Sequence, residues 1–294
     1  MPSLKDLRNR IRTVVNTQQI TKAMKAVSVS KLRRVQASME NTRRYVDALA
    51  RITGRLLQGT PDIDHPFRRL EETPDRVVLV LMSADRGMCG AYNNHIIDKA
   101  TMLIAEIGEP RVDLVCVGKK GRDAFRKTSV NIIGEYLDFG GNVDAQTMAE
   151  VTDLVVERFV SEKCDKVVVV YNSFVNMMKY KPMGIEVLPL DPSELLGDEG
   201  EGSGDDGPTD IIFEPDVESV FGSTLERYLR IKMVTCQADS LTAEHSARMI
   251  AMSNATDNCD ELKQTLTIQM NKARQAMITK ELLEIVSGAE ALKG

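Results

Sequence analysis

The sequence predicts an α/β domain carried between two long helices that wind into an antiparallel coiled coil. Two heptad patterns, one at each end of the chain, predict the helices. Between them, β-branched runs alternate with amphipathic segments, which is typical of a small parallel sheet with crossover helices. We expect a discontinuous coiled coil of residues 1–59 and 212–294, a Rossmann-like domain at 74–190, and an acidic loop at 191–211.

The first predicted helix runs from a capping-box-like start at Ser3 and Asp6 to a stop at Gly59. One heptad register holds over most of its length, at Leu4, Leu7, Ile11, Val14, Leu32, Val35, Met39, Val46, Leu49 and Leu56. In the middle the register passes through polar residues, and the apolar ones shift to Ile20, Met24 and Val27. We therefore expect the seam, the row of residues facing the partner helix, to rotate or loosen between residues 18 and 28.

A proline-rich linker at 60–75 precedes the alternating part of the chain. Apolar, β-branched runs predict strands at 76–82, 112–117 and 166–171, and a further edge strand at 185–190. Amphipathic segments predict helices at 94–107, 119–126 and 144–161.

The segment 191–210 is acidic and low in complexity. Residues 191–218 contain eleven Asp or Glu and no Lys or Arg. Such a composition cannot bury a core, so a solvated loop is expected, and binding to a basic partner surface is the alternative.

The second predicted helix starts at Pro215, which suits a first helical position, and only Gly222 interrupts it before Gly288. Its seam reads Ile231, Val234, Ala238, Leu241, His245, Met249, Met252, Ala255, Cys259, Leu262, Leu266, Met270, Ala273 and Met277. At ~1.5 Å per residue it spans roughly 110 Å, so it must protrude from a compact domain. The alternative is two shorter helices broken near residues 254–258.

Composition is that of an intracellular protein without a membrane span. The chain is 43% hydrophobic and 28% charged, with net charge −5. Its longest apolar run, 77–82, is too short to cross a bilayer, and we expect no secretory signal. Five cysteines without a CxxC pair, and three scattered histidines, predict neither disulfides nor a metal site.

The loop SADRGMCGAYN (83–93) follows a predicted strand and precedes a helix, where phosphate loops sit. Its glycines, Gly87 and Gly90, fit neither the dinucleotide fingerprint nor the P-loop, so a structural turn is expected. Asp85, Arg86 and Cys89 could form a reactive cluster, but nothing marks Cys89 as activated and we predict no catalysis. Nucleic-acid binding by the basic first helix is not expected, because its Lys and Arg are spread along the heptads and aromatics are missing before Tyr45.

Three long stretches resemble one family. They are LKDLRNRIRTVVNTQQITKAMKAVSVSKLRR (4–34), the 83–93 loop, and EHSARMIAMSNATDNCDELKQTLTIQMNKARQAMITKELLEIVSGAEAL (244–292). They are similar to the gamma subunits of F-type rotary ATP synthases, and the likeness covers both long helices and the α/β region in chain order.

The resemblance implies a rotor that performs no bond chemistry and holds no cofactor. The coiled coil would be the central shaft inside a ring of alternating alpha and beta subunits. The α/β domain would sit at its foot with the epsilon subunit and the membrane c-ring. The chain would lie peripherally at the cytoplasmic face of a bacterial plasma membrane, with neither membrane insertion nor nucleic-acid partner.

The resemblance also implies roles for particular residues. Arg274 and Gln275 match the family's contact with the beta-subunit catch loop. Leu282, Ile285, Val286 and Leu292 match the apolar tip that turns in the sleeve of the ring, and Ile211, Phe213 and Glu214 match the foot near the c-ring and epsilon. The alternative function is a Rossmann-like enzyme with a coiled-coil arm, which would bind and turn over a nucleotide as an isolated chain.

Overall fold

The computed structural model describes residues 3–59, 65–69, 74–190 and 217–291, and within these the side chains of 40–44, 57–59, 68, 217–219 and 290–291 are not described. Contacts divide the chain into two compact units. One contains residues 1–28 with 248–294, and the other contains 29–247. Both long helices contribute to both units.

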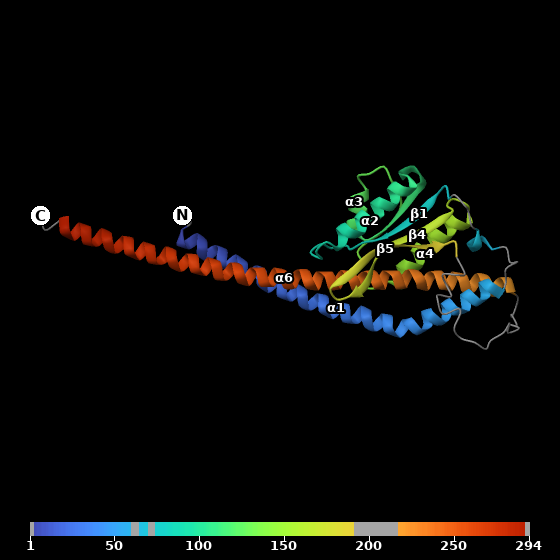
Figure 1. Ribbon diagram of the computed structural model, residues 1–294, viewed down its shortest axis with the longest axis horizontal. Helices are drawn as coiled ribbons and strands as arrows, with labels where there is room; N and C mark the ends of the chain where they lie inside the picture. Colours follow the sequence, from blue (N-terminus) through green and yellow to red (C-terminus); the bar gives the residue numbers. More distant parts are fainter. Residues whose placement is uncertain (1–2, 60–64, 70–73, 191–216, 292–294) are drawn as a thin grey trace. The chain divides into compact units, whose positions relative to one another are not determined.

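A five-stranded sheet lies at the centre of the 29–247 unit (Figure 1). The strands are β1 (Val77–Met82), β2 (Val112–Val117), β3 (Asn131–Tyr136), β4 (Lys166–Asn176) and β5 (Lys179–Leu188), in the spatial order β3-β2-β1-β4-β5. The first four are parallel, and β5 pairs antiparallel with β4 as an edge strand. The strand order reverses at β1, as it does in doubly wound folds.

Helices cover both faces of this sheet. On one face, β1 residues Val77, Leu79 and Leu81 pack against α2 (Tyr92–Ile107) and α3 (Lys119–Phe125). On the other face, Val78, Val80 and Met82 pack against α4 (Ala145–Val160) and the first part of the C-terminal helix. Single 3-10 turns lie at η1 (Pro66–Arg68) and η2 (Glu109–Arg111). Because every β1 side chain is buried on one face or the other, the strand reads as a continuous apolar run.

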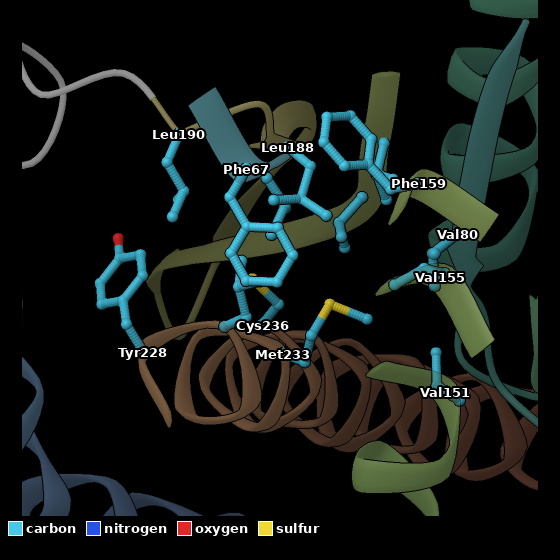
Figure 2. Close-up of a cluster of buried hydrophobic side chains, with 14 of the residues drawn as sticks. Phe67, Val80, Val151, Val155, Phe159, Leu188, Leu190, Tyr228, Met233 and Cys236 are labelled. Carbon is cyan, nitrogen blue, oxygen red and sulfur yellow. The ribbon is translucent and has the colours of Figure 1, made fainter. Parts of the chain in front are cut away.

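The largest hydrophobic cluster among the described residues joins the sheet to the long C-terminal helix (Figure 2). Met233 and Cys236 of that helix pack with Phe67, Leu188 and the α4 residue Phe159. Phe221, Leu225 and Leu229 of the same helix, and Leu49 and Leu56 of the N-terminal helix, belong to the same cluster. The first part of the C-terminal helix is therefore a component of the α/β core.

Every strand and helix predicted inside this domain is present. The structure adds one strand that was not predicted and lengthens two others. β3 was missed, because its residues are only half-buried or exposed and it contains Gly134. β4 continues five residues beyond the predicted end at Tyr171, and β5 starts at Lys179 instead of Ile185, since the two strands form a long hairpin. Asp144 caps α4, accepting from the backbone N–H groups of Gln146 and Thr147.

Both long helices are continuous. α1 extends from Leu4 to Gly59, and Ser3 and Asp6 form the reciprocal hydrogen bonds of a capping box, each 3.2 Å long. α6 extends from Val217 to Ala291 without a break at 254–258, so the prediction of one helix is confirmed over its alternative. The predicted start at Pro215 and the acidic segment 191–210 lie outside the described residues.

The expected rotation of the α1 seam is wrong. Gln18, Thr21 and Ser28 are buried in the original register, whereas Ile20 and Val27 are 59% and 56% exposed. Hydrogen bonding allows polar side chains to occupy the seam, because each buried hydroxyl finds an acceptor. The seam therefore stays on the same face of α1, and between residues 18 and 28 polar side chains replace apolar ones in it.

Candidate functional site

In doubly wound domains, ligands bind at the carboxyl edge of the sheet, next to the strand where the order reverses. Here that edge is the loop after β1, and its polar groups serve the fold. Asp85 accepts hydrogen bonds from the backbone N–H groups of Lys119 and Asp138, both 3.1 Å. Ser83 accepts from the N–H of Gly121, and Asn93 accepts from that of Ala84. The predicted structural turn at 83–93 is confirmed by these contacts.

Gly118 is required at this edge because its backbone lies very close to that of Ser83. Gly118, after β2, has φ +104°, and a Cβ there would lie 2.0 Å from the carbonyl oxygen of Ser83. Only glycine fits this position, so β2 and the β1 loop can meet.

Helix α6 occupies the edge where a nucleotide would otherwise bind. The Tyr92 hydroxyl lies 2.7 Å from the Ser240 hydroxyl and donates to the Ser240 carbonyl at 3.0 Å. Tyr92 also packs with Ala84, Cys89 and Ala243, and the buried Asn172 donates to its carbonyl.

Four further α6 residues form hydrogen bonds with loops and with the end of β4 at the same edge. Gln237 accepts from the backbone N–H of Asp144 at 3.0 Å, and Asp239 accepts from that of Phe174 at 3.1 Å. His245 Nε2 donates to the Gly141 carbonyl at 2.8 Å, and the Ser246 hydroxyl donates to the Met177 carbonyl. We call these five α6 residues with their partners the polar collar: Gln237–Asp144, Asp239–Phe174, Ser240–Tyr92, His245–Gly141 and Ser246–Met177.

The collar surrounds the helix. At 3.6 residues per turn, its five α6 residues project in about four directions around the axis. Every residue from Cys236 to Ser246 is buried except Asp239, which is half-buried. Val35 and Met39 of α1 fill the remaining side, against Ala238 and Leu241. The α6 segment is therefore enclosed by α1 and by three separate parts of the sheet edge.

Burial changes the acid–base properties of collar groups. Desolvation raises the pKa of Asp239 above its usual 3.8, while hydrogen bonds from Ser173 and Phe174 act in the opposite direction. Desolvation also raises the pKa of Tyr92, and the nearby Glu244 adds to the rise. Tyr92 is therefore a neutral hydrogen-bonding group at physiological pH.

The thiols are not poised for chemistry. All five cysteines are free, and only Cys259 is not fully buried. Burial raises the pKa of Cys116, Cys164 and Cys236 to about 12 in each case.

In the smaller unit, α1 and α6 meet through a polar contact. The hydroxyls of Thr21 and Thr256 lie 2.7 Å apart and are buried, and Lys25 donates to Ser253 at 3.0 Å. As the residue number rises along α1 it falls along α6, so the helices are antiparallel. Continuing this pairing at equal rise places Leu4 level with about residue 273 of α6.

Beyond that level α6 has no cover among the described residues. From Arg274 to Ala289 every side chain is exposed. The predicted site residues Arg274, Gln275, Leu282, Ile285 and Val286 lie on this stretch, with Leu282, Ile285 and Val286 exposed by 58%, 67% and 59%. Leu262 and Met277, predicted in the seam, are also exposed, by 49% and 46%. The predicted residues Ile211, Phe213, Glu214 and Leu292 lie outside the described residues.

Sequence reasoning missed the collar. The heptad pattern draws attention to the seam, whereas Gln237, Asp239, Ser240 and Ser246 lie outside it. A signal was present in the segment QADSLTAEHS (237–246), which lacks Lys and Arg although helix surfaces normally carry them. A run of small polar residues without long cations indicates a helix enclosed by polar partners.

The described part of the chain contains no cluster of His, Cys, Asp and Glu that could hold a metal ion. None of its helices is long and apolar enough to cross a membrane.

Comparison with known proteins gives a consistent picture. A family model described as ATP synthase matches residues 3–292. The ATP synthase gamma chain of Pelotomaculum thermopropionicum is 40% identical over 293 residues, covering 100% of both chains. That of Symbiobacterium thermophilum is 40% identical over 292 residues, covering 99% of this chain and 98% of the relative.

Two solved structures share the fold. A chain of the Euglena gracilis mitochondrial ATP synthase, from a structure with its c-ring in one rotational state, gives a TM-score of 0.68 at 21% identity, covering 98% of this chain and 94% of that one. A chain of the Tetrahymena thermophila mitochondrial ATP synthase central stalk and c-ring gives 0.61 at 24% identity, covering 80% and 99%.

Proposed function

Because this chain belongs to the ATP synthase family and matches its gamma chains over its whole length, we propose that it is the central-stalk rotor of an ATP synthase. In this role it couples proton flow through a membrane c-ring to ATP synthesis or hydrolysis at beta-subunit sites. We propose that the coiled coil of 1–59 and 212–294 is the shaft and that 74–190 forms its foot.

The observation that carries this proposal, beyond family membership, is the exposed end of α6. A single helix with Leu282, Ile285 and Val286 exposed is unfavourable in water, and contiguous apolar surface of this kind marks an interaction site. A sleeve of alpha and beta subunits would provide the cover that the described residues of the chain do not. Leu292 would extend the same apolar tip.

Arg274 and Gln275 are proposed to contact the beta-subunit catch loop. Both are exposed and precede the apolar tip on the same helix. A guanidinium presents a planar fork of donors that can hold a carboxylate with two hydrogen bonds, which suits a contact that must be made and broken.

The foot is proposed to meet the epsilon subunit and the c-ring, with Ile211, Phe213 and Glu214 at that contact. The chain would then lie at the cytoplasmic face of a bacterial plasma membrane, attached through the complex and not inserted. It takes no part in bond chemistry in this proposal. The filled carboxyl edge supports this, because α6 lies where an enzyme of this fold would bind nucleotide.

A comparison of the energy released by proton flow with the energy of one ion pair favours a coupling force that is distributed over the shaft. One charge crossing ~150 mV releases roughly 3.5 kcal/mol, and several protons are used for each ATP. An exposed ion pair contributes about 0–1 kcal/mol. Arg274 alone therefore cannot carry the coupling, and the profile of the whole shaft must share it.

Co-expression tests the proposed function most simply. The chain should co-purify with two larger ATP-binding subunits, and the isolated chain should show no nucleotide turnover. Micromolar nucleotide affinity with turnover in the isolated chain would instead support a Rossmann-like enzyme.

Arg274→Ala tests the catch contact. The variant should fold and assemble normally, because the side chain is exposed, and it should weaken the coupling of rotation to ATP turnover in the reconstituted complex. Lys272→Ala, an exposed cation two residues away, is the matched control. Unchanged ATP turnover in the Arg274 variant would count against the contact.

A further inference from the structure

The polar collar has a feature that ordinary helix packing does not require. The neighbouring α6 segment, from Phe221 to Met233, packs on the domain with apolar side chains and adds one charged hydrogen bond, from Arg230 to Asp153 of α4 at 2.6 Å. From Gln237 to Ser246 the attachment changes to directional hydrogen bonds, each to a different backbone or side-chain group of the sheet edge.

The two kinds of contact resist different motions. Apolar packing is non-directional, so a helix can turn slightly about its axis without losing the burial that holds it. Hydrogen bonds weaken steeply when their angle changes, and bonds on several sides of a helix cannot all follow a rotation about its axis. The collar therefore fixes the angle of α6 relative to the sheet.

We propose that the polar collar is the joint through which torque passes between the α/β domain and α6. This inference rests on the proposed rotor function and adds the residues that make the foot and the shaft turn together. Around the α6 axis Ser240 and Ser246 lie to either side of His245, at roughly 140° and 100° from it, so turning α6 in either direction strains at least one of the bonds to Tyr92, Met177 and Gly141.

Two features show that the collar is built to be rigid. Tyr92, Ser240, His245 and Gln237 are each at most 5% exposed, so water does not compete for their bonds. The loop that meets His245 contains Gly140 and Gly141 at φ +60° and +73°, and a Cβ on Gly141 would lie 2.8 Å from the imidazole. The loop backbone is thus shaped to reach the histidine, and Lys31 of α1 donates to Gly140 beside it.

The test removes collar hydroxyls without changing side-chain volume much. The collar variant combines Tyr92→Phe, Ser240→Ala and Ser246→Ala. The control variant combines Ser223→Ala and Thr235→Val, which removes two α6 hydroxyls that bond to carbonyls of α6 itself. Both are assembled with the alpha and beta subunits, and a probe on Met102→Cys, at an exposed position of α2, reports the angle of the foot.

The measured quantity is the variance of the probe angle during one catalytic pause. This variance rises as the torsional stiffness between the ring and the foot falls. The collar variant loses two of the five residue pairs. If the pairs share the load equally, the collar's contribution to the variance should rise about 1.7-fold, and the total variance should exceed that of the parent. The control variant should match the parent.

An unchanged variance in the collar variant, with rotation intact, would overturn the inference while leaving the rotor function in place. Absence of any rotation in the parent complex would instead overturn the proposed function. If the triple variant does not assemble, Tyr92→Phe alone is measured, and an unchanged variance there would likewise overturn the inference.

Discussion

Thr21 and Thr256 show how a hydroxyl can replace a methyl group in a helical seam. Each hydroxyl also lies within hydrogen-bond distance of a carbonyl of its own helix, Gln18 for Thr21 and Met252 for Thr256. The two hydroxyls have two protons between them, so one donates across the seam while the other donates back to its helix. No polar atom of the pair is left without a partner.

This pairing predicts strong non-additivity. Thr21→Val and Thr256→Val each remove the same cross-helix bond, so the double variant should lose about 0.5–1.5 kcal/mol less than the sum of the singles. Urea unfolding of the full chain measures the four free energies. The exposed pair Thr13→Val and Thr265→Val, whose hydroxyls bond only within their own helices, should be additive. Additive losses at Thr21 and Thr256 would show that the hydroxyls do not interact.

Asp239 predicts a pH dependence with a definite sign. Burial raises its pKa in the folded chain above 3.8, so the folded state holds the proton more tightly than the unfolded state. This carboxyl therefore favours folding below its unfolded pKa, and that contribution is lost as pH rises through the folded pKa. Asn at this position does not titrate and keeps an oxygen that can accept from Phe174.

Asp239→Asn should consequently gain stability relative to the parent at about pH 7, and the gain should shrink towards about pH 4. Thermal unfolding of both chains at the two pH values measures the difference. Asp98→Asn, on the exposed face of α2, is the matched control and should show a smaller change. A gain at Asp239 that grows on acidification would contradict the sign.

Predictions for single residues were confirmed where the interactions involve only residues nearby in sequence. The Ser3–Asp6 box depends on groups within three residues, and it formed as predicted. The buried positions of Gln18 and Ser28 depend on what the partner helix offers, more than two hundred residues away. Hydrophobicity alone placed Ile20 and Val27 in the seam, whereas both are exposed.

At the scale of elements, α6 changes its environment along its length. It is part of the α/β core near Met233, enclosed by the collar near Ser240, paired with α1 near Thr256, and exposed from Arg274 onward. The continuous heptad pattern correctly predicted one helix. It did not reveal these four environments, because apolar residues repeat with similar spacing in all four parts of the helix. β3 was missed for a related reason, since an edge strand that is half-exposed has no continuous apolar run.

The exposed end of α6 should be dispensable for the fold. Replacing Leu282 and Ile285 by Ser should change the unfolding free energy of the isolated chain by no more than about 0.5 kcal/mol. The same replacement at Leu266, which is buried in the seam, should cost more than about 2 kcal/mol. Urea unfolding compares the two, and light scattering should show less self-association of the Leu282/Ile285 variant because apolar surface is removed. A large loss of stability on changing Leu282 and Ile285 would mean that the segment is covered within the isolated chain.

At the scale of the whole molecule, the proposed function is mechanical and involves no bond chemistry. The chain belongs to the ATP synthase gamma-chain family, and the sheet edge at which a related enzyme would bind nucleotide holds a helix instead. The overall plan, two helices flanking an α/β domain, could be predicted because each part has its own periodicity. The joint between the parts could not, since it depends on contacts among residues distant in sequence.

Rotation of the assembled complex tests this account most directly. A fluorescent rod is attached at Met102→Cys in a Cys259→Ser background, so that the half-buried native thiol does not compete for the label. With the ring fixed to a surface and ATP supplied, the rod should turn in steps and in one direction. A stationary rod on complexes that continue to hydrolyse ATP at the normal rate would contradict the central claim that this chain is the turning shaft.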